Sequence, residues 1–201
     1  MSGAIIALVC LLFCLGTVFY NFEKKVVTAQ EIALLATMTT LAALFRLPFA
    51  FFPNLQPTTF LVMITGYVWG SQKGFLVGAL AALVSNFFLG QGPWTPWQML
   101  AWGLCGALAG ILGRKAVDYN SKKFAWLAFF CGYLFGWLIN FWHWLAFIYP
   151  LNLKTWLVVC LASFPFDTIH ALGNLMFSII LGPLFYPILK RFRQKFKIEF
   201  L

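Results

Sequence analysis

Long apolar stretches separated by short polar ones run through almost the whole chain. Most are long enough, at about 1.5 Å per residue, to cross much of a bilayer core that is about 30 Å thick. Seven of them predict membrane helices, at residues 3–20, 31–47, 58–69, 75–89, 96–112, 124–148 and 166–189. A shorter run at residues 155–164 stops before Pro165. Because proline disfavours continuation of a helix, we expect this run to form a separate interfacial or re-entrant piece.

The composition supports a membrane location. Of the 201 residues, 62% are hydrophobic, 9% are charged, and the mean hydropathy is +0.87. A typical soluble domain carries about 25% charged residues. The sequence therefore predicts an all-α, polytopic membrane helix bundle. Within it we expect an extra N-terminal transmembrane helix and basic linker in residues 1–26, and a six-helix substrate-binding body in residues 27–201.

The basic residues fall mainly on one side of this predicted topology. With the N-terminus outside, the cytoplasmic connections contain Lys24, Lys25, Lys73, Arg114, Lys115, Lys122, Lys123, Lys190, Arg191, Arg193, Lys195 and Lys197. The outer connections contain only Arg46 and Lys154. The positive-inside rule therefore predicts a multi-pass plasma-membrane protein with an outer N-terminus and a cytoplasmic C-terminus. The tail KRFRQKFK is interpreted as an anchor at the membrane surface, and nucleic acid is not an expected partner.

The connection between the fourth and fifth predicted helices has an unusual composition. It reads GQGPWTPWQ and offers Gln91, Trp94, Trp97 and Gln98 on the predicted outer side. Tryptophan is common at membrane interfaces for generic reasons. Two prolines and two glycines in nine residues nevertheless favour a shaped loop over a simple interfacial anchor.

Polar side chains collect toward the same predicted side. In the last helix, Asp167, His170, Asn174 and Ser178 recur at the spacing of one helical face. Polar groups in apolar spans need partners and are candidates for function. The sequence therefore predicts an outward-facing pocket with tryptophan walls. Its expected members are Arg46, Asn54, Gln56, Asn86, Gln91, Trp94, Trp97, Gln98, Asn140, His143, Tyr149, Asp167, His170 and Asn174. The alternative is a set of interhelical hydrogen bonds that only hold the bundle together.

Two pairs within this set suggest specific chemistry. Arg46 and Asp167 are the only base and the only acid expected near the pocket, so they are expected either to pair or to contact the ligand directly. His143 and His170 could act as axial ligands to the metal of a bound tetrapyrrole, or simply as hydrogen-bonding groups. No resident metal or cofactor is expected.

The sequence offers little for catalysis. It contains five acidic residues and neither an H-E-x-x-H motif nor a Walker A loop. We therefore expect a protein that is not an enzyme. An alternative is a membrane enzyme acting on a lipid or isoprenoid, with Asp167 and His170 as its acid–base pair. A further alternative is an assembly protein that binds no small ligand.

Small residues form a seam along the second predicted helix. Ala29, Ala33, Ala36 and Thr40 lie at spacings of four, three and four residues. Small residues at such spacings let another helix approach closely. This seam is the predicted contact surface for a second protein. Gly74 with Gly78, and Gly106 with Gly110, are interpreted as internal packing positions.

Several of these stretches together resemble a known family. They are AQEIALLATMTTLAAL, RLPFAFFPNLQPTT, GYVWGSQKGFLVGALAALVSN, GQGPWTPWQMLAWG, FGWLINFWHWLAFIYP and FDTIHALGN. Over residues 27–197 the chain is similar to the substrate-binding S-components of energy-coupling factor (ECF) vitamin transporters, and most similar to the branch that takes cobalamin-type corrinoids.

The resemblance implies a mechanism and partners. Such a subunit would bind a vitamin from outside and topple in the membrane against a scaffold subunit driven by two ATPases. Ala29, Ala33 and Ala36 would face the scaffold, and the loops at residues 54–58 and 91–98 would close over the ligand. Cobalamin or a related corrinoid is the first candidate, with haem or a smaller vitamin as alternatives. The helix within residues 1–26 departs from the usual six-helix pattern of the family, and its role is left open.

Overall fold

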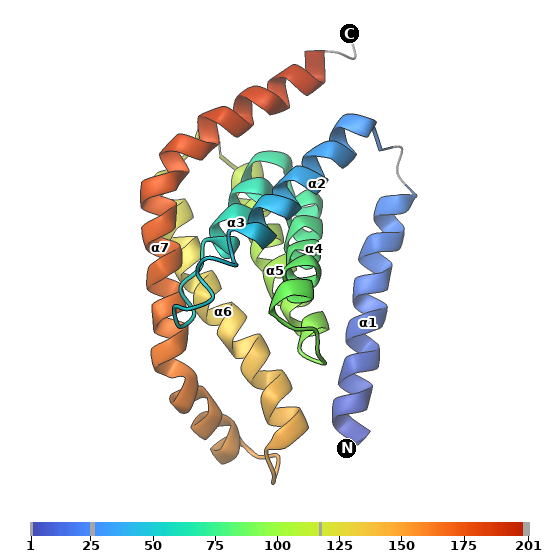
Figure 1. Cartoon of the computed structure of the whole chain (residues 1–201), viewed down its shortest axis with the longest axis vertical. Helices are drawn as coiled ribbons and strands as arrows, with labels where there is room; N and C mark the ends of the chain where they lie inside the picture. The colour runs from blue at the N-terminus through green and yellow to red at the C-terminus, as the bar shows by residue number, and fades with distance from the viewer. Residues whose placement is uncertain (1, 25–26, 117, 199–201) are drawn as a thin grey trace.

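The computed structural model describes residues 2–24, 27–116 and 118–198, and this part of the chain is all-helical. Figure 1 shows helices running up and down side by side, with α2 lying obliquely across the upper part of the bundle. The seven helices are α1 (Ser2–Glu23), α2 (Ala29–Leu44), α3 (Thr58–Trp69), α4 (Ser71–Leu89), α5 (Thr95–Arg114), α6 (Ser121–Phe147) and α7 (Leu153–Ile198). The predicted polytopic helix bundle is confirmed.

The helices differ in how much of a bilayer they can cross. Among the described residues, α1, α4, α6 and α7 are long and apolar enough to span it. In contrast, α2 has 16 residues and α3 has 12. At 1.5 Å per residue these reach about 24 Å and 18 Å, less than the roughly 30 Å of the hydrocarbon core. The two short helices therefore depend on their neighbours to fill the membrane thickness.

The last helix differs from its prediction. We expected a break before Pro165, but α7 continues through Pro165, Pro183 and Pro187 for 46 residues. Proline removes one backbone donor and bends a helix, and neighbouring polar side chains can compensate for the loss. A side-chain bond from the Ser163 hydroxyl to Asp167 Oδ2, at 2.9 Å, spans the turn that contains Pro165, but it does not replace the lost backbone bond. The helix is about 69 Å long by its rise per residue, and Figure 1 shows it curving around one side of the bundle.

The centre of the bundle is built on close backbone approaches. Helix α3 is buried from Thr58 to Val68. A Cβ atom added at Gly66 would overlap the carbonyl oxygen of Gly106 in α5, and one added at Gly78 would overlap the backbone of Trp102. Glycines at these positions let α3, α4 and α5 touch along their backbones. The internal-packing interpretation of the glycines in α4 and α5 is confirmed.

Helix α1 lies along the outside of this centre. Leu11 and Leu15 are its buried residues, and they pack in one cluster with Phe75, Ala79 and Trp97. Most other α1 side chains are exposed, as lipid-facing residues of a membrane helix would be. In Figure 1 the start of α1 and the α6–α7 connection lie at the lower end, while the end of α7 lies at the upper end.

Candidate ligand-binding site

Arg46 is the centre of a polar network at the junction of three segments. It lies just after α2, in the connection to α3. Its Nε donates to Gln56 Oε1 at 3.1 Å, and its Nη1 donates to Ser85 Oγ and Asn86 Oδ1, each at 2.7 Å. One guanidinium thus ties the α2–α3 connection to the last turns of α4. Three of the predicted site residues, Arg46, Gln56 and Asn86, are brought together.

Asn86 extends the network to α5. Its side-chain amide nitrogen donates to Thr95 Oγ1 at 3.0 Å and to Gln98 Oε1 at 2.7 Å. Thr95 in turn donates to Gln91 Oε1 at 2.9 Å. Hydrogen bonds among its own polar residues therefore add to the shape of the GQGPWTPWQ loop. Gln91 and Gln98 join the same network through these bonds.

An indole lies against the Arg46 guanidinium and connects it to α7. The guanidinium carbon is 4.8 Å from the centre of the Trp102 ring, a cation–π contact. Trp102 Nε1 donates to Thr59 Oγ1 at 2.9 Å, and Thr59 Oγ1 lies 2.9 Å from His170 Nε2. His170 also meets Phe135 edge-on, with ring centres 5.0 Å apart. The network thus continues from the α2–α3 connection through α5 and α3 to α7.

The charge of Arg46 is not balanced by Asp167. In the described part of the chain, the ion pairs are Lys73–Glu31 and Lys190–Asp118, so the expected Arg46–Asp167 pair is wrong. The Arg46 guanidinium donates instead to neutral amide and hydroxyl oxygens, which do not offset its positive charge. Burial lowers the pKa of Arg46 to about 10. At neutral pH the site therefore holds a cation without a carboxylate bonded to it.

Asp167 belongs to a second, smaller cluster. Its Oδ2 accepts from Ser163 at 2.9 Å and from Asn140 at 3.3 Å, while Asn140 also donates to Ser163 at 2.6 Å. The space for this carboxylate exists because α6 has Gly136 there, where a Cβ would overlap it. Asp167 and His170 are bonded to different partners on different helices. This arrangement does not support them as the acid–base pair of an enzyme.

The α7 face predicted from the sequence points into the bundle. Asp167, His170, Asn174 and Ser178 are all buried. Asn174 donates to the Ala128 carbonyl at 3.3 Å. Within the described part of the chain, His170 Nδ1, Asn174 Oδ1 and Ser178 Oγ lack a hydrogen-bond partner. Buried polar atoms without partners are uncommon, so this stretch of α7 has unused capacity to bind a polar molecule.

The remaining predicted residues lie at different places. Asn54 donates to the Phe166 carbonyl at 3.1 Å, which holds the α2–α3 connection against α7. Trp94 packs on Trp142 and Trp97 on Phe141, each edge-on at about 6 Å, so both tryptophans contact α6. Two residues are not part of the network: His143 and Tyr149 are exposed. His143 packs on Phe147 and does not face His170, so the two histidines do not form one axial pair.

Metal binding has little support among the described residues. They contain no group of three or more His, Cys, Asp or Glu side chains that could hold a metal ion. The chemistry of the network is that of amides, hydroxyls, one guanidinium and aromatic rings. Such groups can bind and orient a ligand.

Comparison with known protein families identifies the chain. A family model described as "ECF transporter, substrate-specific component" matches residues 6–182. The chain belongs to this family. A search of curated proteins and a search of solved structures return no match. Proteins of this ECF family are transport subunits and not enzymes. Membership of the family implies a substrate, a scaffold subunit and ATPase partners. The match begins within α1, so most of the first helix lies inside the matched region.

The ECF subunit also presents the predicted small-residue seam on its surface. Ala29, Ala33, Ala36 and Thr40 of α2 are all exposed, whereas Leu35, the residue beside Ala36, is buried. A face of small side chains is thus available to another helix. The seam as a contact for the scaffold remains a prediction.

Five residues of the Arg46 network and the Asp167 cluster were missing from the predicted set. Two of them, Ser85 and Thr95, accept hydrogen bonds from Arg46 and Asn86. Thr59 and Trp102 link Arg46 to His170, and Ser163 bonds Asp167. Trp102 lies in an apolar run, but a buried indole N–H needs an acceptor, and this requirement could have marked it. Ser163 lies four residues before Asp167, which places both on one helical face. Thr59 gave no comparable signal.

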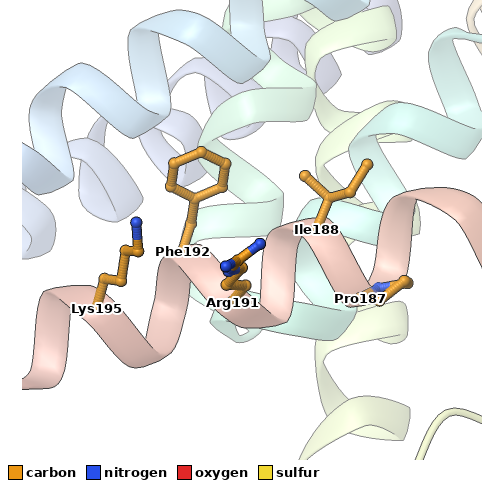
Figure 2. Close-up of a pocket in the computed structure, with 5 residues that line it drawn as sticks. All are labelled: Pro187, Ile188, Arg191, Phe192 and Lys195. Carbon is orange, nitrogen blue, oxygen red and sulfur yellow. The ribbon is translucent and has the colours of Figure 1, made fainter.

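Cavities at other positions were also not anticipated. One, of about 340 Å³, lies at the last turns of α7 and is lined by Pro187, Ile188, Arg191, Phe192 and Lys195. Figure 2 shows Ile188, Arg191, Phe192 and Lys195 projecting from one side of the helix. It lies toward the opposite end of the bundle from the α6–α7 connection (Figure 1).

Proposed function

We propose that this ECF subunit captures a vitamin-sized ligand at the Arg46 network and hands it across the membrane. The observation that supports the proposal most is the network itself. It joins the α2–α3 connection, the end of α4, the start of α5 and the middle of α7 through hydrogen bonds of 2.7 to 3.1 Å and the Arg46–Trp102 cation–π contact. A ligand bonded to these groups would be recognised by four segments at once.

Arg46 is proposed as the main recognition group. Its three hydrogen bonds use Nε and Nη1 and end on neutral oxygens. An anionic or strongly dipolar group of the ligand would supply the negative charge that Asp167 does not supply to Arg46. A charge-assisted hydrogen bond contributes about 1.5–3 kcal/mol. His170 and Asn174, whose unpartnered buried atoms lie deeper on α7, are proposed as further ligand contacts.

Two further groups of side chains are proposed to contact the ligand. Its apolar surface would lie against Trp94 and Trp97. Its polar edge would be oriented by Asn54, Gln56, Asn86, Gln91, Gln98, Asn140 and Asp167. The α2–α3 connection and the GQGPWTPWQ loop would then cover the ligand from the outer side. His143, in the last turns of α6, and Tyr149, in the α6–α7 connection, are exposed, so their place in the site requires a shift of both segments.

A cobalamin-type corrinoid remains the first ligand to test. It has a broad ring face for tryptophan and many peripheral amides that match Gln56, Asn86 and Gln98 in hydrogen-bonding chemistry. Haem is the alternative that the Arg46 cation favours, because its propionates are anionic. A smaller vitamin with a carboxylate would use the same cation with fewer aromatic contacts.

Delivery is proposed to use the α2 seam. The scaffold subunit would approach along Ala29, Ala33, Ala36 and Thr40, and the subunit would topple against it while two ATPases supply the energy. The proposal includes an outer N-terminus and a cytoplasmic C-terminus, in keeping with the basic residues near the start of α2 and the end of α7.

Calorimetry on the purified protein tests the binding step. We would titrate cobalamin, haemin and a panel of smaller vitamins, and repeat the tightest titration with Arg46→Gln. Loss of one charged bond should weaken binding about 10- to 150-fold. Arg193→Gln is the matched control, because Arg193 also donates to a neutral oxygen, the Val68 carbonyl, at 2.7 Å. It should bind as the wild type does.

The result distinguishes a wrong choice of ligand from a wrong choice of binding site. If cobalamin and haemin do not bind while a small vitamin binds tightly, the corrinoid assignment is wrong and the site stands. If Arg46→Gln and Arg193→Gln bind every ligand equally well, the Arg46 network is not the binding site.

A further inference from the structure

Three neighbouring cavities follow one face of α6, away from the Arg46 network. The first, about 370 Å³, is polar in part and is lined by Tyr67, Lys115, Asp118, Asn120 and Lys123 among others. The second, about 560 Å³, shares Lys115 and Lys123 with it. The third, about 390 Å³, begins at Phe130, which also lines the second. Shared lining residues make the three cavities one continuous track.

The track changes from polar to apolar along its length. Its middle part is lined by Leu108 and Ile111 of α5 and by Trp126 and Phe130 of α6. These four side chains are between 37% and 61% exposed, so the surface is open to the surroundings of the bundle. Beyond Phe130, the third cavity is lined by aromatic and aliphatic side chains that include Trp137 and Phe164.

The dimensions match one membrane leaflet. Lys123 and Trp137 are 14 residues apart on α6, which is about 21 Å along the helix. Half of a bilayer, including its headgroup region, is about 20–22 Å thick. The lysines therefore lie at headgroup depth when the aromatic end of the track lies near the middle of the membrane.

The polar end of the track is held in place by many contacts. The Tyr67 hydroxyl donates to the Asp118 carbonyl at 3.2 Å. Asn120 Oδ1 caps α6 by accepting from the Lys123 backbone at 2.9 Å. Tyr119 stacks on Tyr186 with ring centres 4.7 Å apart. The α5–α6 connection is thus fixed against α3 and α7, and the lysines project from a stable base.

The charge at this end is suited to a phosphate. Lys115, Lys122 and Lys123 line the second cavity and are exposed. The carboxylate of Asp118 lies 3.6 Å from Lys190 Nζ, which offsets its charge. A protein surface would meet the lysines but would not follow an apolar track that continues into the membrane. An acyl chain would do so.

We propose that this track binds an anionic glycerophospholipid. Lys115 and Lys123 hold the phosphate between the first and second cavities, with Lys122 beside them. One acyl chain lies along Trp126 and Phe130 toward the third cavity. The site is independent of the ligand that the Arg46 network takes. It fixes one lipid against α5 and α6 at the side of the bundle.

Native mass spectrometry of the full chain with phosphatidylglycerol tests this proposal. The Lys115→Gln/Lys123→Gln double variant should bind the lipid roughly 30-fold more weakly, since each lysine near anionic lipid contributes a factor of about five. The matched control is Arg191→Gln/Lys195→Gln, which removes two charges from the cavity in Figure 2. These two residues lie at the membrane surface but outside the track, so the loss of lipid binding should be clearly smaller than in the Lys115→Gln/Lys123→Gln variant.

Two further arms test the acyl chain and the ligand class. Short-chain phosphatidylglycerol and inorganic phosphate should compete poorly with the long-chain lipid, and phosphatidylcholine should bind more weakly than phosphatidylglycerol. Equal losses in the two double variants would show attraction to general surface charge and overturn the proposal. Full competition by inorganic phosphate would also overturn it, because the site would then be an anion site without an acyl groove.

Discussion

Replacing Asn86 by leucine should destabilise the protein much more than the same replacement at Asn174. The two asparagines are 1% and 0% exposed, lie in apolar helices and have nearly the same shape as leucine. They differ in their bonds. Asn86 accepts from Arg46 and donates to Thr95 and Gln98, whereas Asn174 makes one bond of 3.3 Å to the Ala128 carbonyl.

The magnitude follows from these contacts. A hydrogen bond to a charged group contributes about 1.5–3 kcal/mol, and neutral bonds between membrane helices average about 0.6 kcal/mol. Asn86→Leu should therefore cost about 3–4 kcal/mol. Asn174→Leu should cost about 0.6 kcal/mol, because its side-chain oxygen has no partner to lose among the described residues. For a chain of this size, the larger value lowers Tm by about 6–16 °C.

Reversible unfolding in mixed detergent micelles, followed by circular dichroism without ligand, measures both costs. A double-mutant cycle with Arg46→Met should show a coupling of about 1.5 kcal/mol between Arg46 and Asn86. If the two leucine variants unfold within 0.5 kcal/mol of each other, the network does not stabilise the fold and the reasoning from hydrogen bonds is wrong.

Three further predictions concern other parts of the molecule. Gly66→Ala should lower the free energy of unfolding by about 1–3 kcal/mol, because the added Cβ would overlap the Gly106 carbonyl. A Cβ added at Gly16 meets nothing within 4 Å, so Gly16→Ala should be neutral or slightly stabilising. Equal effects of the two variants in thermal unfolding would contradict the close packing. Ala33→Trp should leave calorimetric ligand binding intact while stopping uptake in proteoliposomes with the partner subunits, and loss of binding itself would show that the seam packs internally. Burial raises the pKa of Tyr119 to about 12 from its usual value near 10. On Tyr119 the folded state therefore keeps a proton that the unfolded state loses, so this group makes the unfolding free energy fall as pH rises from about 10 to 12, while Arg46, whose pKa is lowered, acts in the opposite direction. Tyr119→Phe should therefore make the slope of the unfolding free energy against pH more positive in this range, and an unchanged slope would refute the assignment.

The helix positions were predictable because the membrane demands them. Apolar runs bounded by polar residues placed helices close to where they occur, with α3 matching at both ends. The error at Pro165 has a local cause. Proline was treated as the end of a helix, but membrane helices tolerate proline, and α7 continues through it.

The site was predictable as a set of residues and less so as a set of contacts. Arg46, Gln56, Asn86, Gln91 and Gln98 do meet, since polar groups in apolar surroundings seek one another. Their partners could not be read from the chain, because a sequence shows which groups need hydrogen bonds and not which of several neighbours will supply them. The wrong Arg46–Asp167 pair is an example.

The sequence by itself determined that this protein is an all-helical membrane protein with its polar side chains gathered on a few helical faces, because hydrocarbon excludes unpaired backbone and polar groups. Only the tertiary structure decided that Arg46 is bound by Gln56, Ser85 and Asn86 while Asp167 is bound by Ser163 and Asn140. The physical reason is distance. Helix periodicity places groups on a face, but the glycine contacts between helices set how closely and at what height those faces meet.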